Sequence, residues 1–118
     1  MADNTVLSDS ILESVKKDLG AAEWEDAFDD TLIRDINSVF MILFQLGVGP
    51  SVPYVITGSD ESWEDFSTDI ATVEAVRSYI PKKVKLMFDP SASSFVNESD
   101  KEICAELEWR LNVAVDPR

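Results

Sequence analysis

The chain has 118 residues, of which 45% are hydrophobic, so we expect a single domain (residues 1–118) around one compact core. Its 23 acidic residues outnumber its 10 basic ones, and the net charge of −13 argues against specific binding to nucleic acid or to an anionic membrane. Histidine is absent, which removes the usual general base near neutral pH and the usual zinc ligand.

Helical patterns separated by turn residues predict an all-α fold, a small bundle of four to five helices. The first pattern covers residues 10–19 and follows a flexible N-terminus at 1–9. Ser10 and Glu13 have the spacing of a capping box, and Gly20 is placed to end the helix. One apolar face is formed by Ile11, Leu12, Val15 and Leu19.

The second pattern begins at Asp29 or Asp30, either of which can cap it, and ends at Gly47. Nearly every position from 39 to 46 is apolar. A helix that is apolar all round must be covered all round. It is therefore either the central helix of the bundle or a helix that packs against both its own fold and a neighbouring subunit.

A long ordered loop is predicted at about 47–61, because two glycines and two prolines exclude a helix. Residues 54–57 have the composition of an extended strand. Long apolar loops in compact domains are often functional. We therefore regard this loop as a candidate interface with a neighbouring subunit or another protein, although it could also fold back over its own core. The candidate residues are Val48, Pro50, Val52, Tyr54, Val55 and Ile56.

Ser62 is placed to cap a short helical turn, after which a third long helix extends from about residue 70 to 88. Pro81 lies within it, and a kink or break is expected near Tyr79 and Ile80 because proline removes a helical hydrogen bond. Asp89 and Pro90 should end this helix. A last helix is predicted at about 94–113, followed by a free tail at 113–118. Its inward residues are predicted to be Phe95, Val96, Ile103, Leu107 and Leu111.

No pattern in the sequence indicates a reaction. The single cysteine, Cys104, cannot form an internal disulfide and lies in an apolar pattern, so we expect a buried hydrophobic residue. A calcium loop counted from Asp60 lacks the required glycine at its sixth position and the carboxylate at its twelfth. We therefore expect no catalytic residue, cofactor or metal, and a protein that is not an enzyme. The N-terminus lacks the pattern of a secretion signal, which favours the cytoplasm in which the chain is made.

Charges are segregated along the middle of the chain. The acidic residues come first and include Asp60, Glu61, Glu64, Asp65 and Asp69. The basic residues follow and are Arg77, Lys82, Lys83 and Lys85. The acidic group could line a channel, or it could meet the basic group of a neighbouring subunit, as head-to-tail rings require unlike surfaces. An intramolecular arrangement with solvated charges is the alternative.

Two residues of the last helix are further interface candidates. Trp109 and Arg110 belong to the residue types enriched at interface hot spots. The alternative is that Trp109 packs inside the bundle and Arg110 pairs with Glu106.

Five segments, taken in this order, resemble the head–tail connector (adaptor) proteins of tailed bacteriophages. They are INSVF at 36–40, QLGVGP at 45–50, WEDF at 63–66, KVKLMFDP at 83–90 and ELEWRLN at 106–112. The resemblance implies a virion structural protein in the neck, made in the host cytoplasm. Such a protein docks on the portal, forms a ring, implied to be dodecameric, and extends the DNA channel towards a tail-side stopper or tail-terminator protein.

The charge agrees with this role, because an acidic channel lets DNA pass without binding it. No membrane partner is expected. The alternative function is an acidic DNA mimic or regulatory protein that binds a nucleic-acid-processing enzyme.

Overall fold

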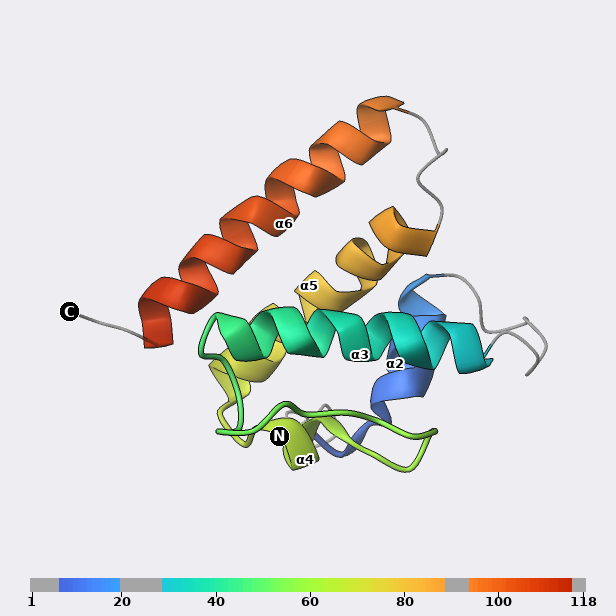
Figure 1. Ribbon diagram of the computed structural model, residues 1–118, viewed down its shortest axis with the longest axis vertical. Coiled ribbons are helices and arrows are strands. Elements are labelled where there is room, and N and C mark those ends of the chain that lie inside the picture. Colours follow the sequence, from blue (N-terminus) through green and yellow to red (C-terminus); the bar gives the residue numbers. More distant parts are fainter. Residues whose placement is uncertain (1–6, 20–28, 89–93, 116–118) are drawn as a thin grey trace.

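The computed structural model describes residues 7–19, 29–88 and 94–115. Its helices are α2 (Ile11–Asp18), α3 (Asp29–Gln45), α4 (Trp63–Phe66), α5 (Ile70–Phe88) and α6 (Ser94–Val115). The predicted all-α class is confirmed, and the described ranges contain no strand. Figure 1 shows α3 passing in front of α5, with α6 above them and α4 and the long loop below.

The helix starts follow local capping chemistry. The Ser10 hydroxyl accepts a hydrogen bond from the amide of Glu13 at 3.3 Å, so α2 begins where the capping pattern predicts. Ser62 and Asp65 form a reciprocal capping box at α4, in which the Asp65 carboxylate accepts the Ser62 amide at 3.0 Å. Gly20, predicted to stop α2, lies outside the described residues, as do Asp89 and Pro90.

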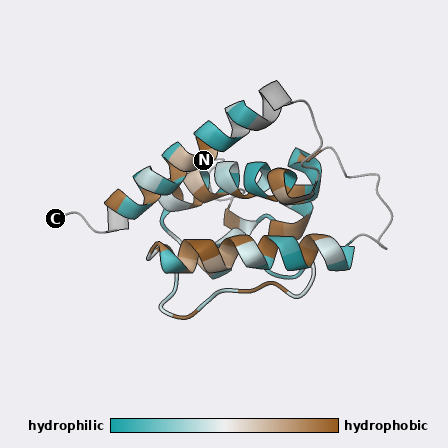
Figure 2. Ribbon diagram, turned by 45° about the horizontal axis from the view of Figure 1, so that its top comes forward, coloured by the Kyte–Doolittle hydropathy of each residue, from teal (hydrophilic) through white to brown (hydrophobic). Residues whose placement is uncertain are grey.

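The core lies around α5, which packs against α2, α3 and α6. The largest side chain in it is Trp63, which is fully buried and donates its indole N–H to the Ser14 hydroxyl at 3.2 Å. Hydrophobic residues recur along the helices and also appear in the loop below α3 (Figure 2). The fully buried residues of α3 and α5 include Leu32, Ile36, Val39, Phe40, Leu43, Val73, Val76, Tyr79, Ile80 and Val84.

Of the kink or break expected near Tyr79 and Ile80, the break does not occur, because α5 continues through Pro81 from Ile70 to Phe88. Proline leaves the carbonyl of Arg77 without its helical partner. Pro81 is itself buried, and the helix is held by packing on three others. Tertiary packing therefore maintains a helix that local preference would interrupt.

The last helix differs from prediction in two details. α6 continues to Val115, so only residues 116–118 of the predicted tail remain, and these lie outside the described residues. Cys104 is buried, as predicted, but Ile103 is 39% exposed and does not point inward. A small rotation of the helix decides which of two adjacent apolar residues faces the core. The side chains of Phe95 and Val96 lie outside the described residues.

The N-terminal segment contacts the bundle at its last residues. The Asp9 carbonyl accepts the Trp63 amide at 3.2 Å, and Ser10 forms an isolated antiparallel bridge with Ser62. Residues 1–6 of the predicted flexible N-terminus lie outside the described ranges. Asp9 and Ser10 thus join the start of α2 to the start of α4.

Candidate interaction surface

The long loop between α3 and α4 is held against the bundle by one polar side chain. Asn37 of α3 donates its side-chain amide to the Ile56 carbonyl at 3.0 Å and accepts the Ile56 amide at 2.8 Å. This pair of bonds satisfies both backbone groups of Ile56, as a strand partner would. Residues 54–57, whose composition is that of a strand, are held by these bonds and do not form a strand.

An aromatic cluster fixes the same loop from inside. The ring of Tyr54 lies 5.1 Å from that of Phe40 and 5.6 Å from that of Phe66. Gly49 has a φ of +95°, and a Cβ built there would lie 2.5 Å from the Phe66 ring. Only glycine fits this position, because both its backbone conformation and the space available exclude a side chain. The loop is thus fixed at both ends.

The six candidate residues of the loop divide between core and surface. Val48 and Ile56 are buried, so the chain's own core covers them. Tyr54 and Pro50 are half-buried. Val52 and Val55 are 65% and 54% exposed. The chain's own core therefore buries part of the apolar loop, whereas Val52 and Val55 remain exposed.

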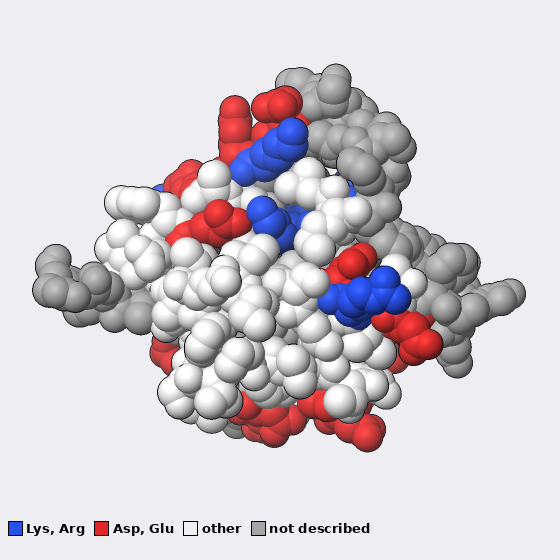
Figure 3. All heavy atoms as spheres, in the orientation of Figure 1, with Lys and Arg blue, Asp and Glu red and all other residues white. Residues whose placement is uncertain are grey.

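Met41 of α3 adds to the uncovered surface. It is 43% exposed and follows Asn37 by one helical turn, on the side of α3 that holds the loop. We call Met41, Val52 and Val55 the loop face. Figure 3 shows a broad area without charged side chains over this part of the molecule, with acidic side chains along its lower edge.

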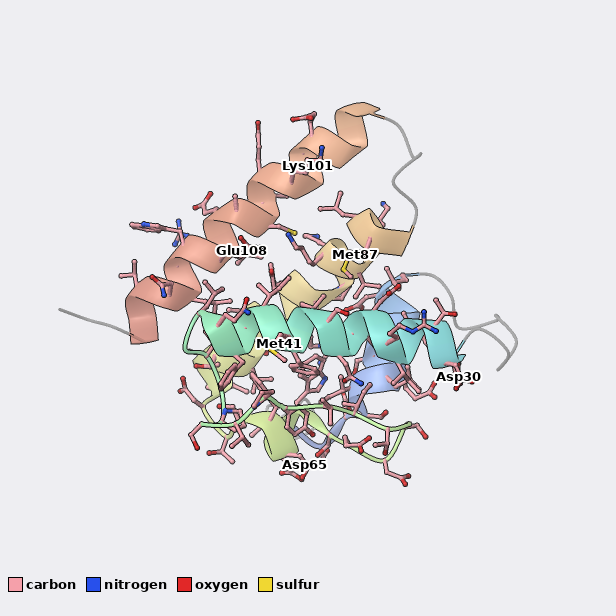
Figure 4. The ribbon with its side chains drawn as sticks, in the orientation of Figure 1. Asp30, Met41, Asp65, Met87, Lys101 and Glu108 are labelled. Carbon is pink, nitrogen blue, oxygen red and sulfur yellow. The ribbon has the colours of Figure 1, made fainter. Side chains whose placement is uncertain are left out.

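The acidic residues near the loop have different local roles. Asp65 caps α4, and Asp69 accepts the backbone amide of Thr72 at 3.3 Å at the start of α5. Glu61 accepts the amide and hydroxyl of Thr57 at 3.1 and 2.8 Å. Figure 4 places Asp65 at the lower edge of the molecule.

Asp60 and Glu64, in contrast, are exposed and form no hydrogen bond or ion pair with any residue that the structure describes. Two carboxylates of the acidic run are therefore available to a partner. We call Asp60 and Glu64 the acidic edge.

Among the basic candidates, Arg77 and Lys83 form ion pairs with carboxylates that the structure describes. Arg77 approaches Asp9 at 3.5 Å, and Lys83 approaches Glu108 at 3.3 Å. Lys82 and Lys85 line a groove of about 410 Å³ between the end of α2 and α5. Arg77 and Pro81 line the same groove. The basic segment thus forms ion pairs within the molecule at two positions and contributes to the wall of a groove.

Trp109 and Arg110 of α6 both lie on the surface. Arg110 donates to Glu106 at 2.6 Å within the helix, as the intramolecular alternative predicts. Trp109 is 65% exposed and is not packed in the bundle. Val113, one turn further, is 44% exposed. This end of α6 is tied to α3 by Asn112, whose side chain donates to the Leu46 carbonyl at 3.1 Å.

Tyr54, Glu61 and Tyr79 have pKa values that depart from their ordinary values. Burial, and then the hydrogen bond to Glu108 at 2.6 Å, raise the pKa of Tyr79 well above its ordinary value. Burial, and then the carboxylates of Asp65 and Glu61, raise the pKa of Tyr54 to about 12. Burial alone would raise the pKa of Glu61, but the hydrogen bonds from Thr57 outweigh it and lower the pKa. The two tyrosines therefore stay neutral over a wide pH range.

The raised pKa values of Tyr54 and Tyr79 predict a loss of stability at alkaline pH. Both pKa values are higher in the folded chain than in the unfolded chain, where tyrosine has a pKa of about 10. As the pH rises, the unfolded chain loses these protons first. The contribution of the two tyrosines to the free energy of unfolding is therefore complete below about pH 10 and falls as the pH rises towards 12 and beyond. Urea unfolding from about pH 8 to about pH 11 should show this fall, reduced in Tyr79→Phe. An equal fall in Tyr79→Phe and wild type would contradict the assignment.

The described part of the chain offers no metal site, since no group of three or more histidine, cysteine, aspartate or glutamate residues there could hold an ion. Among the same residues, no helix is long and apolar enough to cross a membrane. The fold and surface define a small acidic helical protein with an uncharged, partly apolar face.

The comparisons identify the family. The family model described as phage connector protein matches residues 11–118, so the chain belongs to the phage connector protein family. This is a family of structural proteins. No curated protein and no solved structure matched the chain. The match favours the connector interpretation over the acidic DNA mimic.

Proposed function

We propose that the chain is a head–tail connector of a tailed phage virion. In this proposal it docks on the portal protein, forms a ring in the neck and extends the DNA channel towards a tail-side stopper or terminator. The observation that supports ring formation is the loop face, because Val52 and Val55 are exposed on a loop that Asn37 fixes in place. A fixed apolar surface needs less ordering on binding than a mobile one.

Charge supports the proposed channel. Each subunit carries a net charge of −13, and a ring multiplies this excess around its axis. Duplex DNA is itself strongly negative, so such a ring repels the DNA that passes through it. The family membership supports a location in the virion. A dodecameric ring is part of the proposal and is the stoichiometry that the family resemblance implies.

Phage particles provide the test of this function. We expect mass spectrometry of purified virions to detect the chain, and negative-stain images of particles made without it to show DNA-filled heads that have not joined tails. Adding the purified protein to these heads should restore tail attachment. Absence of the chain from mature virions, or normal tailed particles in its absence, would refute the proposal.

A further inference from the structure

The last helix, α6, is attached to the bundle along a single line of side chains. Cys104 and Leu111 are buried, and Leu107 is half-buried against the same core. These residues follow one another at intervals of three and four, so they lie on one side of the helix. Apart from Glu108, the other side chains of α6 that the structure describes are exposed. In Figures 1 and 2, α6 accordingly lies at the outside of the molecule.

The bundle beneath α6 is held together by contacts that do not involve this helix. The bond from Trp63 to Ser14 joins α4 to α2, and α5 packs against both α2 and α3. Of the buried hydrophobic side chains in the described ranges, only Cys104 and Leu111 belong to α6. The core therefore consists almost wholly of residues that precede α6 in the chain.

One carboxylate links the middle of α6 to α5. Glu108 accepts the Tyr79 hydroxyl at 2.6 Å and approaches the Lys83 ammonium at 3.3 Å. Figure 4 shows Glu108 between the two helices. The side chains of Lys83 and Glu108 are each 29% exposed, so water reaches the boundary between α5 and α6. Both charges can be hydrated when the helices separate.

The end of α6 is packed less closely against the bundle. Leu111 borders a groove of about 440 Å³, whose other lining residues include Val48 and Phe66. Just beyond it, Asn112 donates to the Leu46 carbonyl at 3.1 Å, and this bond is exposed. Few buried contacts therefore hold this end of the helix in place.

We propose that α6 undocks from α5 as one unit while α2 to α5 remain folded, and that the bonds of Glu108 to Tyr79 and Lys83 control how often it does so. Local opening is characteristic of elements with few buried apolar contacts and many exposed backbone hydrogen bonds. The inference does not depend on the proposed function. It gives the molecule one fixed surface, the loop face, and one adjustable element, α6.

Native-state hydrogen exchange, measured by NMR at low urea concentrations, tests the proposal. An undocked α6 should lose its protection, because most helical stability in proteins comes from packing. We expect the amides of residues 104–112 to exchange at least about tenfold faster than the most protected amides of α3 and α5. Their exchange should also depend less on urea, since undocking exposes less surface than global unfolding. Equal rates and equal urea dependence would overturn the proposal.

A core substitution separates local opening from global unfolding. Ile11→Val shortens a fully buried side chain of α2, so it destabilises the intact state and the α6-undocked state alike, relative to the unfolded chain. It should speed exchange of the most protected amides of α3 and α5 by about fivefold and leave the amides of α6 unchanged. Equal acceleration of the α6 amides would show that α6 unfolds only with the whole bundle.

A substitution in α6 itself tests the role of Glu108. Glu108→Ala should speed exchange of the α6 amides by about tenfold, because docking no longer forms the bonds to the carboxylate. The matched control is Glu106→Ala, which makes the same change on the same helix at an exposed side chain paired with Arg110. It should alter the same rates by about twofold or less. Equal effects of the two variants would overturn the assignment of Glu108.

Discussion

Replacing Trp63 by alanine is expected to lower the free energy of unfolding by about 3–5 kcal/mol. Trp63 is completely buried at the start of α4, and its indole N–H donates to Ser14 of α2 at 3.2 Å. The change removes the largest fully buried side chain and leaves a cavity between α2 and α4. It also removes the hydrogen-bond donor that pairs with the buried hydroxyl of Ser14. Urea unfolding followed by circular dichroism measures the loss.

A second tryptophan supplies the matched control. Trp109→Ala makes the same chemical change at a side chain that is 65% exposed, so the free energy of unfolding should change by no more than about 0.5 kcal/mol. If Trp109 belongs to an interface, this variant should instead bind heads more weakly. Equal destabilisation by the two substitutions would show that the burial of Trp63 does not determine stability.

The parts of the fold that depend on local chemistry could be predicted from the sequence. Ser10 and Ser62 cap the helices that they were expected to start, because a capping bond joins residues three positions apart. The end of α3 before Gly47 likewise follows from the backbone, since Gly47 has a φ of +85°. These features do not depend on which elements later pack together.

Features set by tertiary packing could not be predicted in the same way. Pro81 should interrupt an isolated helix, but the contacts of α5 with three other helices maintain it. Apolar periodicity did not distinguish Ile103 from Cys104 as the inward residue. Nor did residue type separate the buried Trp63 from the exposed Trp109. In each case the outcome depends on the position of a neighbouring helix.

The candidate interaction surface, too, could be predicted from the sequence only in part. Composition identified the whole apolar loop, but only the bonds between Asn37 and Ile56 show which residues face outward. Met41 and the α2–α5 groove were missed as parts of the surface. The sequence did contain one signal. Asn37 is a polar residue in a strongly apolar helix, and a polar side chain in such a place needs a hydrogen-bond partner, which a backbone segment can supply.

Placing a charge on the loop face should abolish assembly while the chain remains folded. Val52 and Val55 are 65% and 54% exposed, so Val52→Asp and Val55→Asp should each change the free energy of unfolding by no more than about 0.5 kcal/mol. In an assembled ring the new carboxylate would be buried without a partner, next to an edge that is already acidic. We expect binding to heads that lack the chain to fall by at least about tenfold. Sedimentation of labelled protein with such heads measures this.

The control for this prediction is Val113→Asp, which introduces the same charge at an exposed valine on the last helix. It separates an effect of the loop face from a general effect of added negative charge. Deleting residues 54–57 would be a poorer test, because it removes Ile56 from the core together with the bonds from Asn37. Assembly of Val52→Asp and Val55→Asp at the level of Val113→Asp would exclude the loop face from the interface. A selective loss in the two loop variants would mean that the valines left uncovered by the fold are covered in the virion.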